Sequence, residues 1–263
     1  MRKLTLAACL GACLGALSSC SLLAPAAVVP MPMILQQELG PEHSAGLLVL
    51  LPGAGDRADR FRQHGILEMA RELAPSFDVI AADAHIGYYT SKSLLERLDA
   101  DVILPAIDAG YRQIWLLGIS IGSFGALHYA SQHPQRIDGV LLLGPFLGSG
   151  AVAKSVLTAP DLASWDAQAI EPKGDMNRIT HAVWSWLQAQ VAAADGATIL
   201  LGYGSGDGPG TISERLQQAL QSDHFATRPG GHDWNTWRPL IRELLPQMNA
   251  ARTSRGSAGG VVR

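Results

Sequence analysis

The feature that most restricts the fold is a run of five consecutive apolar residues at 47–51, with the sequence LLVLL, which ends at Pro52 and Gly53. A strand with one face in water alternates apolar and polar residues, whereas an unbroken apolar run of this length is typical of a strand buried on both faces. Residues 57–73 follow with apolar side chains at steps of three and four, which predicts a helix with one apolar face. This opening indicates a parallel sheet that is covered by helices on both sides.

The alternation of apolar runs and helical patterns continues along the chain. Further strands are expected at residues 77–81, 114–117, 140–143, 198–201 and 224–227. Further helices are expected at residues 93–109, 122–132, 211–220 and 237–248. Pro105 is expected to kink or split the first of these helices. Strands separated by helices imply crossover connections, so the predicted fold class is α/β, with a mostly parallel central sheet flanked by helices.

Residues 147–195 interrupt this alternation and are expected to form a short insertion, because the segment is longer than an ordinary crossover. The segment contains Trp165, Trp184 and Trp186. An insertion above the carboxyl ends of the strands would bring these rings close to a site there. Core packing of a covering helix is the favoured interpretation for Trp184 and Trp186.

The composition is that of one folded domain, expected at residues 41–248. Of the 263 residues, 48% are hydrophobic and 16% are charged, which excludes disorder as the overall state. The formal net charge is −3 and no stretch is rich in Lys and Arg, so no nucleic-acid partner is expected. All three cysteines lie in the first twenty residues, which leaves the domain without a disulfide. The tail at 249–263 lacks apolar periodicity and is expected to be disordered.

Residues 1–19 have the pattern of an export signal peptide. Arg2 and Lys3 are followed by an apolar run over residues 4–17, which is too short to span a bilayer. The sequence LSSC at 17–20 then resembles the lipobox of bacterial lipoproteins. This resemblance implies cleavage before Cys20 and attachment of a diacylglycerol to its sulfur. An ordinary signal peptide with a chance cysteine is the alternative.

Residues 20–40 are accordingly expected to be a lipidated N-terminus and a tether, because residues 21–32 are rich in Ala and Pro and carry no charge. The expected partner is a membrane, reached through the lipid at Cys20. By the same resemblance, Ser21 directly after the cysteine implies sorting to the outer membrane of a Gram-negative cell, facing the periplasm. The oligomeric state is left open.

The pentapeptide GISIG at 118–122 matches the pattern G-x-S-x-G around Ser120. Alone the match is a weak signal, but a predicted strand runs into it and a predicted helix leaves it, which is the strand-turn-helix context that the motif requires. A serine held in such a turn leaves no room for Cβ atoms two positions away, which explains Gly118 and Gly122. Ser120 is therefore the candidate nucleophile.

A serine hydroxyl is a poor nucleophile at neutral pH and needs a base within hydrogen-bond reach. Six of the eight histidines have simpler explanations, which leaves His85 and His232. His232 lies in the glycine-rich loop PGGHDW at 229–234, between the last predicted strand and the last predicted helix. It is the favoured base, and a histidine that merely caps the helix is the alternative.

The carboxylate that orients this base is expected at Asp207, which follows a predicted strand and so lies at the carboxyl edge of the sheet. Asp195 and Asp223 precede strands and are expected at the opposite edge. Asp233 is adjacent to His232 and approaches the far nitrogen of the ring only with difficulty. A helix N-cap is the alternative role for Asp207.

An acyl-transfer site also needs backbone donors for the developing oxyanion. One is expected at the amide of Ile121, directly after the nucleophile. A second is expected in the loop after the first strand, at Ala54 or Gly55, where glycines allow an amide to face the site. A tight turn without a catalytic role is the alternative for that loop.

The order Ser120, Asp207, His232, with the turn at the serine and the glycine loop after the first strand, resembles the α/β-hydrolase superfamily over residues 47–246. The segments YRQIWLLGIS at 111–120 and GGHDW at 230–234 look like those of a small bacterial esterase-type group. The resemblance implies a serine hydrolase that cleaves carboxylic esters through an acyl-enzyme.

Two departures from the family pattern bear on the substrate. Ser123 stands where many relatives have glycine, which affects packing behind the turn. Pro52 stands where lipase-like relatives have histidine, which argues against true lipase activity. An acyltransferase or thioesterase of the same fold is an alternative function, and a non-catalytic binding lipoprotein is another.

The loop after the strand at 77–81 carries His85, Tyr88 and Tyr89, which are expected either to contact the substrate or to be ordinary loop aromatics. The partner of the site is expected to be a small ester. No metal-ligand spacing, phosphate-binding glycine loop or dinucleotide fingerprint occurs in the sequence, so no cofactor is expected.

Overall fold

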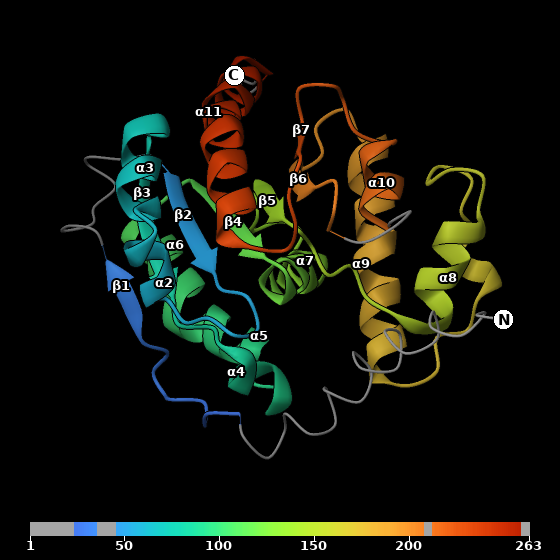
Figure 1. The fold of residues 1–263 in the computed structure, drawn as a ribbon, viewed down its shortest axis with the longest axis horizontal. Coiled ribbons are helices and arrows are strands. Elements are labelled where there is room, and N and C mark those ends of the chain that lie inside the picture. Colours follow the sequence, from blue (N-terminus) through green and yellow to red (C-terminus); the bar gives the residue numbers. More distant parts are fainter. Residues whose placement is uncertain (1–23, 36–45, 208–211, 259–263) are drawn as a thin grey trace, which may run out of the picture.

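A computed structural model describes residues 24–35, 46–207 and 212–258 of the chain. Its centre is a seven-stranded sheet in the order β1-β3-β2-β4-β5-β6-β7 (Figure 1). The strands are β1 (Met33–Leu35), β2 (Gly46–Leu51), β3 (Phe77–Ala82), β4 (Gln113–Ile119), β5 (Gly139–Leu143), β6 (Thr198–Gly204) and β7 (Phe225–Arg228). All neighbouring strands are parallel except β1, which runs antiparallel to β3. The predicted α/β class with a mostly parallel sheet is confirmed.

The run LLVLL forms most of β2 and is buried on both faces. Leu47, Val49 and Leu51 point into one hydrophobic core, and Leu48 and Leu50 point into the other. All five side chains are 0% exposed. Successive residues of a strand point to opposite faces, so an unbroken apolar run supplies both cores at once.

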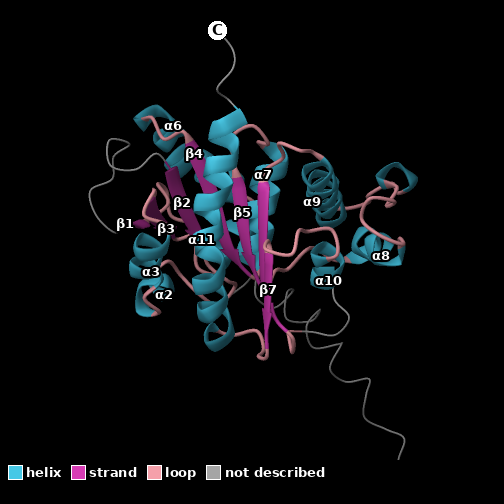
Figure 2. Cartoon of the chain, turned by 90° about the horizontal axis from the view of Figure 1, so that it is seen from above, coloured by secondary structure: helices cyan, strands magenta, loops and turns pink. Residues whose placement is uncertain are grey.

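Helices cover both faces of the sheet (Figure 2). One face carries α2 (Asp59–Gln63), α3 (Ile66–Leu73) and α11 (Trp234–Ala258). The other carries α4 (Ile86–Thr90), α5 (Leu94–Leu98), α6 (Leu104–Ala109), α7 (Ile121–Gln132), α8 (Gly150–Thr158), α9 (Asp175–Ala192) and α10 (Ile212–Gln217).

Two predicted helices are divided in the structure. The helix expected at 57–73 consists of α2 and α3, separated at Gly65, whose φ of 67° lies in the left-handed region that breaks a helix. The helix expected at 93–109 consists of α5, a π-helical turn (Asp99–Ile103) and α6. Pro105 lies in the first turn of α6, where its missing N–H costs least, and the wider turn precedes it.

The insertion at 147–195 is largely helical, with α8 and α9 joined through a short 3₁₀ turn (Ala167–Ala169). Trp184 and Trp186, both on α9, are 0% and 6% exposed, and the Trp184 indole nitrogen donates to the carbonyl oxygen of Leu147 at 3.0 Å. Helix α9 packs against α7 and α8. The core interpretation of these two tryptophans is confirmed.

The N-terminal strap, defined as residues 24–35, corrects the expectation of a free tether there. Met31 is 1% exposed and belongs to the core on the face of the sheet that carries α4 to α10, and its amide donates to Asp101 at 2.8 Å. Val28 bonds to the Tyr88 hydroxyl through both its amide and its carbonyl group. The strap ends in β1, which completes one edge of the sheet. The absence of charge, interpreted as a sign of a tether, also lets the segment pack against apolar surface.

The last helix is longer than its apolar pattern predicts. Helix α11 continues to Ala258, so the expectation of disorder from residue 249 is corrected for residues 249–258. Its first half is fixed by buried apolar residues such as Leu240 and Leu244, and extending an established helix costs little. The predicted signal peptide and Cys20 lie outside the described residues. Within the described ranges, no helix combines the length and apolar character needed to span a bilayer.

Candidate functional site

Ser120 lies at the sharp turn between β4 and α7, as the motif predicts. Its φ of 54° and ψ of −116° are strained for a residue with a side chain. A Cβ on Gly118 would lie 2.4 Å from the carbonyl oxygen of Gly122, and one on Gly122 would lie 2.3 Å from that of Leu51. The two glycines therefore let β4, α7 and the end of β2 close around the serine.

Ser123, the first departure from the family pattern, is accommodated behind this turn. It is 0% exposed, and its hydroxyl donates to the carbonyl oxygen of Gly118 at 2.6 Å. The extra polar group is therefore satisfied internally, and the turn keeps its shape.

Three predicted residues from distant parts of the chain meet at the carboxyl edge of the sheet. His232 Nε2 is 2.8 Å from Ser120 Oγ, and His232 Nδ1 is 2.6 Å from Asp207 Oδ1. The serine comes from the β4–α7 turn, the aspartate from the segment after β6, and the histidine from the loop between β7 and α11. The imidazole thus bridges the hydroxyl and the carboxylate, the arrangement in which a histidine can take a proton from a serine.

The rival aspartates lie elsewhere. Asp233 accepts hydrogen bonds from the Thr236 amide and hydroxyl in the first turn of α11, so it acts as a helix cap. Asp195 and Asp223 are exposed in the connections that lead into β6 and β7. Asp207, by contrast, has a side chain only 10% exposed, against 45% for His232. The burial of Asp207 holds its carboxylate in place, whereas the imidazole of His232 is open to solvent.

The loop after β2 packs directly against the nucleophile. Residues 53–56 form a turn closed by the Asp56 amide and the Gly53 carbonyl oxygen at 3.1 Å. A Cβ on Gly53 would be 3.7 Å from Ser120 Cβ, and Ala54 and Gly55 are exposed at the tip. The amide of Ile121 is the first of α7 and has no acceptor within the helix. All three predicted donors therefore belong to the two turns around Ser120, and their role remains a prediction.

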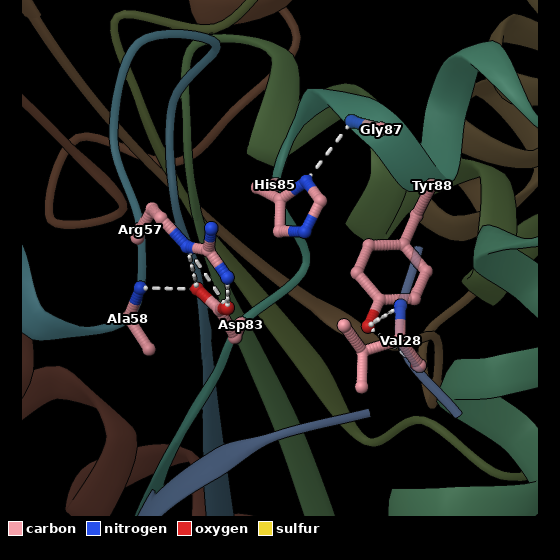
Figure 3. A network of polar contacts seen from close by, with 7 residues as sticks. All are labelled: Val28, Arg57, Ala58, Asp83, His85, Gly87 and Tyr88. Atoms are coloured by element: carbon pink, nitrogen blue, oxygen red, sulfur yellow. Dashed lines mark hydrogen bonds and ion pairs between the residues drawn. The ribbon is translucent and has the colours of Figure 1, made fainter. Parts of the chain in front are cut away.

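Figure 3 shows a polar network that holds this loop. Arg57 donates to Asp83 through its Nε and Nη2 atoms, and the Ala58 amide donates to Asp83 Oδ1 at 3.0 Å. Asp83 follows β3 and is 5% exposed, and its hydrogen bond to Arg57 raises the pKa of the guanidinium. Sequence analysis missed this pair, since an arginine after one strand and an aspartate after the next do not indicate their contact.

The aromatic loop after β3 serves packing. His85 is 2% exposed and its Nδ1 accepts the Gly87 amide at 3.1 Å at the start of α4, while burial lowers the pKa of the imidazole. Tyr88 is 0% exposed, with its hydroxyl on Val28 of the strap (Figure 3). Neither side chain is available to a substrate in this conformation, which corrects the expectation of substrate contact for both and favours the alternative of ordinary loop packing. Tyr89 is half-buried with its hydroxyl against Gly125 of α7, and its substrate contact stays a prediction.

Gly144, directly after β5, is a further site residue that sequence analysis missed. Its φ is 45°, and a Cβ there would lie 2.5 Å from Asp207 Oδ2 and 3.2 Å from His232 Nδ1. The signal in the sequence was a glycine directly after an apolar strand, which is common to many turns. Among the described residues, no group of three or more His, Cys, Asp and Glu side chains could hold a metal ion.

Comparisons with known proteins agree with this architecture. The model of the alpha/beta hydrolase fold family matches residues 46–171. The curated 2-hydroxy-6-oxononadienedioate/2-hydroxy-6-oxononatrienedioate hydrolase of Comamonas testosteroni is 28% identical over an alignment of 116 positions that covers 41% of this chain. That match spans 36% of the length of the relative.

Solved structures with a similar fold include Est1E from Butyrivibrio proteoclasticus, with a TM-score of 0.57, 15% identity, and 84% of this chain and 93% of that chain covered. The fluorophosphonate-binding serine hydrolase F of Staphylococcus aureus has a TM-score of 0.54, 15% identity, and coverages of 81% and 86%. A ferulic acid esterase has a TM-score of 0.52, 18% identity, and coverages of 78% and 84%. At these identities the similarity shows the fold alone.

The family match covers β2 to β5, including the loop after β2 and the turn at Ser120. The chain has the α/β-hydrolase fold.

Proposed function

We propose that this protein is a serine hydrolase that cleaves carboxylic esters through an acyl-enzyme. The observation that carries the proposal is the chain of two hydrogen bonds from Asp207 through His232 to Ser120, at 2.6 and 2.8 Å. Hydrogen-bonded nucleophile, base and orienting acid are the combination that acyl transfer from an ester requires. The esterases and the serine hydrolase among the similar structures support the same reaction class.

In the proposed reaction, Ser120 Oγ attacks the ester carbonyl carbon while its proton passes to His232 Nε2. Asp207 stabilises the imidazolium through Nδ1. The tetrahedral intermediate collapses by expelling the alcohol, which receives the proton from His232. A water molecule then attacks the acyl-enzyme, with His232 again taking and returning one proton, and the carboxylic acid leaves with Ser120 restored.

The negative charge on the carbonyl oxygen would be held by the Ile121 amide and by that of Ala54 or Gly55. Both turns are fixed by the packing around Ser120, so these donors need little reorganisation during the reaction, which is what makes such donors effective. In this mechanism a base activates the serine and backbone donors stabilise the oxyanion, so the proposed steps use no metal ion.

Hydrolysis is favoured over acyl transfer because the His232 side chain is 45% exposed, so water reaches the base freely. Short acyl groups are the expected substrates, since the tryptophans of the insertion are used in its own core and α9 packs on α7. An acyltransferase or thioesterase would share the acyl-enzyme and differ in the acceptor or the leaving group.

The test is labelling with a fluorophosphonate probe, followed by turnover of esters from acetyl to palmitoyl. Ser120→Ala should abolish labelling and lower hydrolysis by about three or more orders of magnitude in a folded protein. Ser131→Ala is the matched control, because Ser131 lies in the last turn of the same helix and its hydroxyl donates to the His128 carbonyl oxygen, away from the triad. Unchanged turnover in the Ser120→Ala protein would contradict the proposal, and faster palmitoyl than butyryl turnover would contradict the substrate range.

We further propose that the mature protein is a lipoprotein of the outer membrane, anchored through Cys20. Support comes from the lipobox-like sequence and from the strap, whose Val28 and Val29 are 46% and 66% exposed and carry no charge. Only three residues separate Cys20 from the strap, which begins at Ala24. An extended chain spans at most about 3.5 Å per residue, so the anchor would keep the domain close to the bilayer.

Expression in a host that processes lipoproteins tests the anchor. Wild-type protein should appear in the membrane fraction with an acylated N-terminal Cys20, whereas Cys20→Ser should be soluble and unmodified by mass spectrometry. Cys13→Ser is the matched control and should behave as wild type. Soluble wild-type protein without added mass would mean an ordinary signal peptide.

A further inference from the structure

Three polar atoms surround the point that a Cβ atom on Gly144 would occupy. A Cβ on this glycine would lie 2.5 Å from Asp207 Oδ2, 2.8 Å from Trp237 Nε1 and 3.2 Å from His232 Nδ1. The second carboxylate oxygen of Asp207 and the indole nitrogen of Trp237 therefore both lie within 3 Å of one point. A side chain at residue 144 would separate them, and the glycine leaves the space between them open.

Neither of these two atoms has a hydrogen-bond partner among the described residues. Asp207 Oδ1 is paired with His232, but Asp207 Oδ2 and Trp237 Nε1 are both buried and unpaired. An indole N–H can only donate and a carboxylate oxygen accepts, so the two atoms are complementary. Each unpaired buried polar atom carries a free-energy penalty, and pairing the two would remove both penalties.

Trp237 also contacts the base. The centroids of the Trp237 and His232 rings are 4.9 Å apart, and the two ring planes are at an angle of 87°. The side chain is 6% exposed and comes from α11, which packs against β5 and β6 (Figure 2). Trp237 therefore contacts the base and lies beside the acid, from a helix whose position is fixed by the core.

We propose that Trp237 is a positioning residue for Asp207 and His232, and that its indole N–H donates to Asp207 Oδ2 in the active enzyme. This inference rests on the proposed function. The bond fixes the rotation of the carboxylate, so that Oδ1 stays directed at His232 Nδ1, and it stabilises the ionised form of Asp207. The edge-to-face contact limits the imidazole to the orientation that reaches Ser120.

Trp237→Phe tests the proposal, because phenylalanine keeps a ring and removes the donor. The variant should lower kcat by about tenfold to a hundredfold with KM unchanged, as for loss of a hydrogen bond to a charged group. The acid limb of kcat/KM should move to higher pH, because the anionic pair loses stabilisation and takes up a proton more readily. Lost packing alone would not move this limb.

Trp165→Phe is the matched control. The Trp165 indole also donates to a side chain, Ser155 Oγ at 3.0 Å, but within the insertion. The Trp165→Phe variant should have the kcat and the pH profile of the wild type. A folded Trp237→Phe protein with kcat within twofold of wild type and an unmoved acid limb would overturn the proposal.

A second measurement tests the contact even if no ester is turned over. The indole N–H proton resonance of Trp237, assigned through its loss in Trp237→Phe, should move in Asp207→Asn because the acceptor loses its charge. The Trp165 resonance should stay in place. A Trp237 resonance that does not respond would overturn the hydrogen bond, whereas an inactive wild-type protein with a responsive resonance would overturn only the proposed function.

Discussion

At the scale of single residues, the site depends on glycines, which have no Cβ atom, as much as on the side chains that would react. Gly118 and Gly122 allow the turn at Ser120, and Gly144 allows Asp207 to approach His232. In each case a Cβ would come within 2.5 Å of a neighbouring atom, a separation that side chains do not adopt. These three glycines thus allow the close packing that places the reacting groups.

Asp207→Asn should lower ester turnover by roughly two to four orders of magnitude, because the amide cannot stabilise the imidazolium and favours the wrong tautomer of His232. Asp233→Asn should change turnover little, since Asp233 caps α11 through Thr236. Steady-state kinetics of the two purified variants checks this. Greater sensitivity at Asp233 would show that the acid has been assigned to the wrong residue.

Gly144→Ala should lower kcat by about a hundredfold or more while the protein stays folded, because its Cβ would displace Asp207 Oδ2 and strain a backbone with φ of 45°. Gly174→Ala is the control, since Gly174 also has a positive φ, 81°, but open space around it. Kinetics and circular dichroism on both proteins make the comparison. Equal activities would mean that Asp207 tolerates displacement.

At the scale of elements, the site is assembled from strand ends and from the loops that leave them. Strands β2, β3, β4 and β6 each end at residues that bear on the site, because parallel strands bring their carboxyl ends to one edge. The ion pair between Arg57 and Asp83 joins the loops after β2 and β3. The turn that carries the predicted oxyanion donors is thereby tied to the neighbouring strand.

Loss of this ion pair should affect both catalysis and stability. Arg57→Ala should lower kcat by about threefold to tenfold, because the turn that includes Ala54 gains freedom, and should lower the free energy of unfolding by about 1–3 kcal/mol, since the buried Asp83 carboxylate is left with the Ala58 amide as its partner. Arg62→Ala is the control, because its pair with Asp59 lies wholly on the surface. An equal effect of both variants on kcat would contradict the anchoring role.

Helix α7 carries a histidine that should make stability depend on pH. Burial lowers the pKa of His128 to about 4 from an ordinary value of 6.5. Below pH 6.5 the unfolded chain therefore binds a proton that the folded protein does not, and stability falls as the pH drops toward 4. At pH 5 the loss from this residue amounts to about 2 kcal/mol.

Urea unfolding at pH 7 and pH 5 measures this dependence. His128→Gln should lose about 2 kcal/mol less than wild type between the two values, because glutamine does not titrate. An identical pH dependence in the two proteins would mean that His128 is protonated equally in the folded and unfolded states.

At the scale of the whole molecule, the N-terminal strap is part of the domain. It pairs with β3 through β1 and inserts Met31 into the core on the face of the sheet that carries α4 to α10. A segment that was expected to be a spacer thus contributes to folding. If Cys20 is acylated, the fold itself continues almost to the anchor.

Met31→Ala should therefore destabilise the protein by about 2–4 kcal/mol, since it leaves a cavity in the core, and should lower Tm by about 2–4 °C for each kcal/mol. Met33→Ala, at a residue that is 38% exposed, should cost less than about 1 kcal/mol. Thermal unfolding of both variants distinguishes a packed strap from a tether. Equal small effects would favour the tether.

The sequence by itself determined the fold class and the three residues now brought together, because both depend on local patterns. A doubly buried strand must be apolar throughout, and a serine in a strained turn must have small neighbours, so LLVLL and GISIG carry these constraints directly. The order of the elements also indicated that Asp207 follows a strand, whereas Asp195 and Asp223 precede strands.

Only the tertiary structure decided the burial of the strap and of His85, the pairing of Arg57 with Asp83, and the approach of Trp237 to Asp207. These contacts join residues that are far apart in the sequence, and no periodic pattern in the sequence indicates them. An uncharged segment such as the strap is equally compatible with a tether and with packing. Which of the two forms depends on the apolar surface that the rest of the chain presents, and that surface exists only once the domain has folded.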